Sequence, residues 1–168
     1  MLKILDEKFK KNKLGFFLQS LLATAVVFII LLVLDPVSNS AVIASLGASS
    51  FIAFTMPHAK ESSFRCLVGG YMIGVIIGNL CYFISIAGFM QNVQILNQHS
   101  AVIFCAIAVG LSIFLMVITN TEHPPAAGMA LALFLNQAGL RAILVVLAGI
   151  TSLVIIKTWL RPYLKDLV

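Results

Sequence analysis

The stretch AVIFCAIAVGLSIFLMVI, residues Ala101–Ile118, is almost entirely apolar. It lies within a longer stretch, Cys66–Thr121, that contains no Asp, Glu, Lys or Arg. A helix needs about 20 apolar residues to cross the hydrocarbon core of a bilayer. The stretch therefore predicts a membrane-spanning helix, and similar apolar runs lie on either side of it.

The composition of the whole chain agrees with this prediction. The chain has 168 residues, of which 61% are hydrophobic and 10% charged, and its mean hydropathy is +1.07. Soluble domains carry roughly 25% charged residues. The few charges here cannot cover the surface of a soluble domain, which excludes a typical soluble enzyme, a disordered chain and a nucleic-acid-binding protein. The composition indicates one integral membrane domain whose surroundings are the lipid bilayer.

Polar breaks divide the chain into six apolar segments, of which the second and fifth are short. The segments are 14–34, 41–56, 66–90, 101–118, 126–140 and 142–159. We predict an all-α fold, a polytopic transmembrane helical bundle with six crossings, or four if the short segments are re-entrant. Each half of the chain has the order long, short, long. This order favours a 3+3 inverted repeat, an arrangement that transporters often use.

The basic residues predict the orientation in the membrane. The net charge is +5, five lysines lie within residues 1–13, and three basic residues lie near the C-terminus. Because cytoplasmic loops are enriched in Lys and Arg, six crossings place ten of the eleven basic residues in the cytoplasm, with Arg141 as the exception. We predict a protein of the inner membrane with a cytoplasmic segment 1–13, a transmembrane domain 14–160 and a cytoplasmic tail 161–168.

The motif Glu122-His123-Pro124-Pro125-Ala126-Ala127-Gly128 follows the fourth segment. Proline lacks an N–H group and suits the first turn of a helix, so a helix should begin near Pro124 or Pro125. The first N–H groups of a helix have no intrahelical partner and attract anions. We therefore predict an anion site at the backbone of Ala126, Ala127 and Gly128, with His123 as a switchable charge or donor. Glu122 would either repel an anion at this site or carry a proton with it. A tight turn in water is the alternative.

Two groups of polar side chains are lesser candidates for this anion site. Asn120 and Thr121 precede the motif directly. In the second segment, Ser49 and Ser50 follow the small residues Gly47 and Ala48. Their hydroxyl groups could line a polar path, although small residues also serve simple helix packing.

Gly70, Gly74 and Gly78 are four residues apart and lie on one face of a helix. Such a face allows close contact with another helix, within the chain or in a second copy. We predict a homo-oligomer that assembles through this face, with a dimer favoured because two-fold closure is the commonest symmetry.

Two other functions are weaker. His58, Glu122 and His123 could form a metal or enzyme site, but adjacent residues on a helix diverge by about 100°, and no nucleophile–base pair is evident. We expect no cofactor, no metal and no enzymatic activity. The runner-up is an interaction or scaffold protein that assembles through the glycine face and transports nothing.

The sequence resembles the HPP family of integral membrane proteins. The resemblance rests on His123-Pro124-Pro125, on Ala44-Ser45-Leu46-Gly47-Ala48-Ser49, on Pro57 and on Arg65 with Gly69-Gly70, and it covers about Leu14 to Leu160. It implies a bundle usually described with four transmembrane helices. Some members are linked to nitrite transport, so the resemblance implies a transporter or channel for a small inorganic anion such as nitrite. The chain has Phe64-Arg65-Cys66 where members often have Pro-Arg-Asn.

Overall fold

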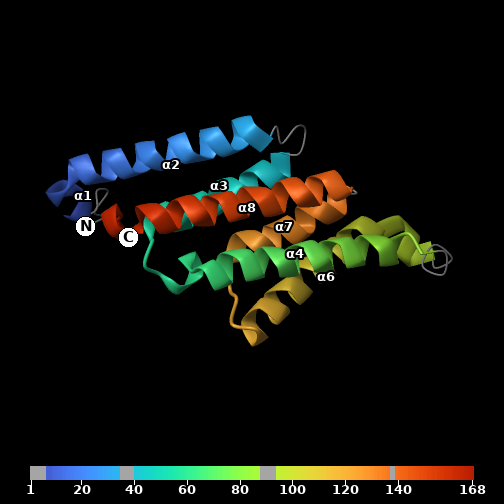
Figure 1. Ribbon diagram of the computed structural model, residues 1–168. Helices are drawn as coiled ribbons and strands as arrows, with labels where there is room; N and C mark the ends of the chain where they lie inside the picture. Colours follow the sequence, from blue (N-terminus) through green and yellow to red (C-terminus); the bar gives the residue numbers. More distant parts are fainter. Residues whose placement is uncertain (1–6, 35–39, 88–93, 137–138) are drawn as a thin grey trace.

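The computed structural model describes residues 7–34, 40–87, 94–136 and 139–168, and within these ranges it contains helices and no strands (Figure 1). This confirms the all-α prediction. The α-helices are α1 (Glu7–Lys11), α2 (Lys13–Leu34), α3 (Ser40–Thr55), α4 (Phe64–Ser85), α6 (Gln94–Ile118), α7 (Pro124–Leu135) and α8 (Leu140–Leu160). Two short 3-10 helices, η1 (Lys60–Ser62) and η2 (Arg161–Tyr163), complete the described chain.

The six apolar segments are confirmed as α2, α3, α4, α6, α7 and α8, which run alternately up and down the bundle (Figure 1). Among the described residues, four helices (α2, α4, α6 and α8) are long and apolar enough to cross a membrane. The 16 residues of α3 and the 12 of α7 give lengths of about 24 and 18 Å, short of a hydrocarbon core of about 30 Å. Six crossings and the inverted repeat remain predictions.

The helix α6 begins earlier than the hydropathy indicates. Its first residue is Gln94, within the polar, uncharged stretch 91–100 that separates two apolar segments in the sequence. Glutamine is a good helix former although it is polar, so low hydropathy does not end the helix here.

The short helix α7 occupies the centre of the bundle. It packs against α4, α6 and α3, while α2 lies on the outside against α3 and α8 (Figure 1). Most of its residues are buried, including Met129 and Leu133, which are 0% exposed. A helix that is apolar on all sides is typical of the interior of a bundle, and α7 therefore sits where the other helices enclose it.

The glycine face of α4 fits against α7 within the same chain. A Cβ atom on Gly78 would lie 2.6 Å from the carbonyl oxygen of Ala130, and one on Gly70 would lie 2.9 Å from Cβ of His123. A Cβ atom on Gly74 would collide with the carbonyl oxygen of Ala126. The prediction that this face joins two copies is therefore wrong, because α7 already fills it. Dimer formation itself stays a prediction.

Both ends of the described chain lie at one end of the bundle, which we call the terminal end (Figure 1). The backbone N–H of Leu167 donates to the carbonyl oxygen of Thr55 at 2.8 Å. The side chain of Gln19 donates to the carbonyl oxygen of Lys165 at 2.7 Å and to that of Phe54. The C-terminal residues are thereby attached to the ends of α2 and α3.

Candidate functional site

His123 precedes α7 directly and is held in place by the turn before it. Asn120 has a φ of 56°, a left-handed conformation that Asn adopts more readily than most residues. The turn leads to His123 in an extended conformation, and Pro124 and Pro125 then begin the helix, as the sequence predicts. The imidazole of His123 is only 1% exposed. A turn and two prolines therefore fix a histidine inside the bundle.

Both ring nitrogens of His123 have hydrogen-bond partners. Nδ1 lies 3.0 Å from the carbonyl oxygen of Glu61, and Nε2 lies 2.8 Å from Oγ of Ser49 on α3. Because a carbonyl oxygen only accepts, Nδ1 carries the proton. In the neutral ring Nε2 is then an acceptor. The Ser49 hydroxyl also lies 3.0 Å from the carbonyl oxygen of Ser45, but the shorter contact to Nε2 needs its one proton, so Ser49 donates to the ring. Burial lowers the pKa of His123 to about 4, against the opposing effect of Glu61, so the ring is neutral at pH 7.

A chain of hydroxyl groups continues from Ser49. Tyr71 on α4 is 0% exposed, and its hydroxyl lies 2.8 Å from Oγ of Ser49 and 2.9 Å from Oγ of Ser45. The hydroxyl of Ser45 donates to the carbonyl oxygen of Pro125 at 2.7 Å. We call Ser45, Ser49, Tyr71 and His123 the polar cluster. It joins α3, α4 and the start of α7 by side chains that would be costly to bury without partners.

The 3-10 helix η1 connects the polar cluster to two further groups. Its Glu61 carbonyl accepts from His123, and its Ser62 carbonyl accepts from Nζ of Lys157 at 2.8 Å. Lys60 forms an ion pair with Glu122 at 2.8 Å. The hydrogen bond between these two partly exposed side chains raises the pKa of Lys60 and lowers that of Glu122. The turn thus ties α8 and the segment before α7 together.

The predicted backbone site at the start of α7 lacks the donors it needs. Two of the first positions are prolines and have no N–H group. The N–H of Ala126 donates to the carbonyl oxygen of His123 at 2.9 Å. Those of Ala127 and Gly128 come after the first helical turn, where the regular bonds to residues four earlier begin. The prediction of three free N–H groups is therefore wrong. The first positions of a helix normally supply the free N–H groups, and here two of these positions are prolines, which have none.

The other predicted site residues separate into those within the polar cluster and those outside it. Ser49 and His123 meet directly. Ser50 donates instead to the carbonyl oxygen of Leu46, and both Gly47 and Ala48 are exposed on the outer side of α3. The remaining two, Asn120 and Thr121, belong to the turn before His123, where the hydroxyls of Thr119 and Thr121 lie 2.8 Å apart.

Sequence reasoning missed Tyr71 and Lys157. Tyr71 lies in a long apolar run, where it resembles any core aromatic residue, and Lys157 is one of the basic residues near the C-terminus that predict the orientation. A signal existed for Lys157, because it stands within the last apolar segment, and ionisable residues within such segments are functional candidates. Lys157 is 5% exposed in the structure.

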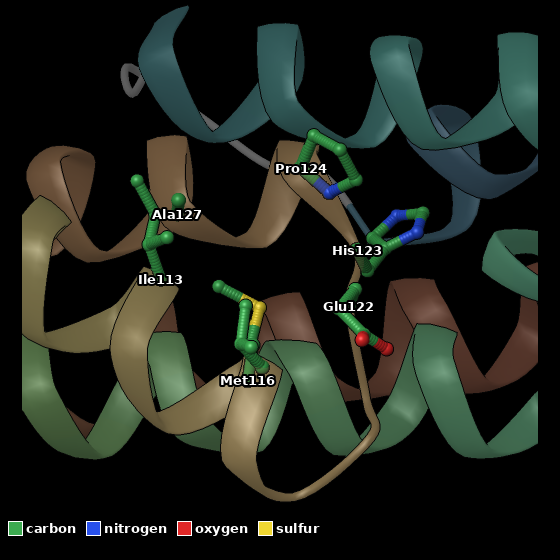
Figure 2. A pocket seen from close by; sticks show the side chains of 7 residues that line it. Ile113, Met116, Glu122, His123, Pro124 and Ala127 are labelled. Carbon is green, nitrogen blue, oxygen red and sulfur yellow. The ribbon is translucent and has the colours of Figure 1, made fainter.

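A groove of about 280 Å³ lies between α6 and the start of α7 (Figure 2). Its walls are mostly apolar, with Glu122 at the polar end. In Figure 2 the carboxylate of Glu122 points away from the ring of His123. The residues that line the groove are Ile113, Met116, Val117, Glu122, His123, Pro124 and Ala127.

The alternative metal site does not form among the described residues. His58 lies beside Asp166, with Nδ1 3.4 Å from the carboxylate, whereas His123 is bonded to Ser49 and Glu61. Within the described ranges, no three His, Cys, Asp or Glu side chains gather in a way that could hold a metal ion.

Comparisons with known proteins give a family. Residues 9–163 match the model of the HPP transmembrane region. A transmembrane protein of Dictyostelium discoideum is 33% identical over 89 residues, which are 53% of this chain but 28% of that protein, so the chain corresponds to a minor part of this relative's length. No solved structure matches. Because the family model covers nearly the whole chain, and because its motif carries the buried histidine, this membrane protein belongs to the HPP family.

Proposed function

We propose that the protein is a transporter or channel for a small inorganic anion, nitrite or a related ion, and that the ion passes the polar cluster. The identity of the anion comes from the resemblance to HPP proteins linked to nitrite transport. The single observation that supports a pathway here is the buried hydrogen bond between His123 and Ser49, which links the two short helices. Polar groups buried within a transmembrane bundle are costly and commonly mark a substrate path.

The chemistry of the polar cluster suits an anion. Its side chains are three hydroxyls and a neutral imidazole, and none of the four is a carboxylate. Hydroxyl groups rotate, so Tyr71 and Ser49 can turn their protons from each other toward a small anion. Transporters also form substrate sites at the ends of short or broken helices, and the start of α7 lies at the polar cluster. In this proposal side-chain donors replace the backbone donors that the sequence predicts.

The orientation is part of the proposal. The terminal end carries the lysines of residues 8–13 and the basic residues near the C-terminus. The positive-inside rule places this end in the cytoplasm, with the protein in the inner membrane. We also propose that it has no enzymatic activity. Ser49 does donate to His123, but Nδ1 of this histidine bonds a backbone carbonyl and not a carboxylate, and both side chains are fully buried inside the bundle.

Uptake by proteoliposomes tests the proposal. Purified protein should carry nitrite into vesicles above the rate of empty vesicles, over a range of pH and membrane potential. Ser49→Ala should lower this rate at least several-fold. Ser50→Ala is the matched control, since Ser50 is the next buried serine on the same helix and bonds only within α3. Its rate should be close to that of the wild type.

Two results would contradict the proposal. No uptake above empty vesicles under any condition would leave the scaffold function as the better account. Equal rates for the Ser49 and Ser50 variants would show that the ion does not pass the polar cluster.

A further inference from the structure

The level of the membrane surface at the terminal end can be located from exposed aromatic residues. Trp159 and Tyr163 at the end of α8 are each 81% exposed, and such residues concentrate at the interface between lipid and water. Lys157, on the same helix, donates to the carbonyl oxygen of Ser62. This bond places η1 and the start of α4 at the same level. The cationic side chains of Lys60 and Arg65 therefore lie among the lipid head groups.

The groove between α6 and α7 begins at this level and continues away from it. Its polar end is Glu122, and its wall on α6 extends through Val117 to Ile113, one helical turn further from the surface. Val117 and Ile113 are 56% and 49% exposed, so the groove is open toward the lipid side of the bundle. Figure 2 shows Ile113 and Met116 from α6 opposite Ala127 from α7. The depth and the apolar walls fit a hydrocarbon chain.

Two cationic side chains lie beside the carboxylate at the polar end of the groove, outside the residues that line it. Lys60 pairs with Glu122 at 2.8 Å, and Arg65 acts on the same carboxylate electrostatically. Arg65 is exposed and uses one nitrogen, Nη2, to donate to the carbonyl oxygen of Thr119 at 2.8 Å. The remaining N–H groups of the guanidinium are available, and arginine binds phosphate oxygens through several donors at once. Glu61 is the other acidic residue close to Arg65 in the sequence, and it does not line the groove.

We propose that this groove is a binding site for an anionic phospholipid, with one acyl chain between α6 and α7 and the phosphate on Arg65 and Lys60. Arg65 keeps free N–H donors near the end of the groove, and an anion bound there would share Lys60 with Glu122. In a phospholipid the phosphate lies at the membrane surface and the acyl chain extends below it. Basic residues at the surface attract such anionic lipids. The site does not depend on transport.

Native mass spectrometry of the purified protein tests the site. The protein should retain phosphatidylglycerol more strongly than phosphatidylcholine with the same acyl chains. Arg65→Gln should lower the affinity for phosphatidylglycerol about five-fold, the effect of losing one cation near a lipid surface. Arg141→Gln is the matched control, because Arg141 is an exposed cation at the start of α8, away from the terminal end. It should leave the affinity unchanged.

A second pair of variants tests the acyl chain. Val117→Phe narrows the groove, while Ile118→Phe places the same side chain at the next exposed position, which does not line the groove. Both positions face lipid, so both variants should fold. Only Val117→Phe should reduce the retention of phosphatidylglycerol, by several-fold.

Three results would overturn the lipid site. The first is equal retention of both lipids by the wild type, and the second is an equal loss in the Arg65 and Arg141 variants. The third is displacement of the lipid by inorganic phosphate at similar concentration, which would indicate a site for a free phosphate ion.

Discussion

Ser49 and His123 are 74 positions apart in the chain, yet Oγ of one lies 2.8 Å from Nε2 of the other with both side chains buried. This hydrogen bond joins the middle of α3 to the start of α7, the two helices that are too short to be ordinary spans. Because neither helix is long enough to span the hydrocarbon core, the bilayer alone does not fix the position of either one. The polar cluster therefore fixes where the short helices lie relative to each other.

Ser49→Ala should destabilise the protein by about 1–2 kcal/mol. The substitution leaves Nε2 of His123 without a donor in a buried place, and an unsatisfied buried acceptor costs this amount. The measured contributions of side-chain hydrogen bonds to the stability of membrane proteins lie at the lower end of this range. Thermal unfolding in detergent measures the change. Ser50→Ala should unfold close to the wild-type temperature, and an equal loss in both variants would contradict the role given to the His123 bond.

Gly74→Ala should destabilise the contact between α4 and α7 by about 1–3 kcal/mol, the cost of inserting a methyl group into a packed interface. The added Cβ would meet backbone, the carbonyl oxygen of Ala126, which cannot turn away as a side chain can. Gly110→Ala on α6 is the control, because a Cβ atom there has no neighbour within 4 Å. Alanine should stabilise that helix slightly. Similar unfolding temperatures for both variants would show that the glycine face is not tightly packed.

Gln19→Leu should release the C-terminal residues. The side chain of Gln19 donates to the carbonyl oxygen of Lys165 and accepts from its N–H at 3.3 Å, and leucine can do neither. Carboxypeptidase should then shorten the variant several-fold faster than the wild type. Ser20→Leu places the same side chain at the exposed neighbouring position and should be cut at the wild-type rate. Equal rates for all three proteins would mean that Leu167 and Thr55 hold the tail without Gln19.

Much of the fold follows from the sequence alone. The six apolar segments, the two short ones among them and the helix start at Pro124 can be found because hydropathy and proline act locally along the chain. The importance of His123 also follows, since it is an ionisable group beside an apolar segment.

The pairing of helices does not follow from the sequence. Gly70 and Gly78 indicate that something approaches α4 closely, but α7 and a second copy would give the same pattern. Tyr71 has no distinguishing signal in its own segment, because its partners lie on α3 and at the start of α7. Hydropathy describes the surroundings of a segment and not the identity of its neighbours, so the polar cluster could only be recognised in three dimensions.

The stability of the protein should fall as the pH decreases from 6.5 toward 4. Burial lowers the pKa of His123 from 6.5 to about 4, so between these values the unfolded chain binds a proton that the folded chain excludes. The stability that His123 contributes is therefore complete above pH 6.5 and decreases below it, by about 3 kcal/mol at pH 4. Unfolding temperatures measured from pH 7 to pH 4.5 should fall, and His123→Gln should reduce this slope. His58→Gln removes an exposed histidine and should keep most of the slope. A wild-type slope that survives in the His123 variant would mean that other groups cause the loss.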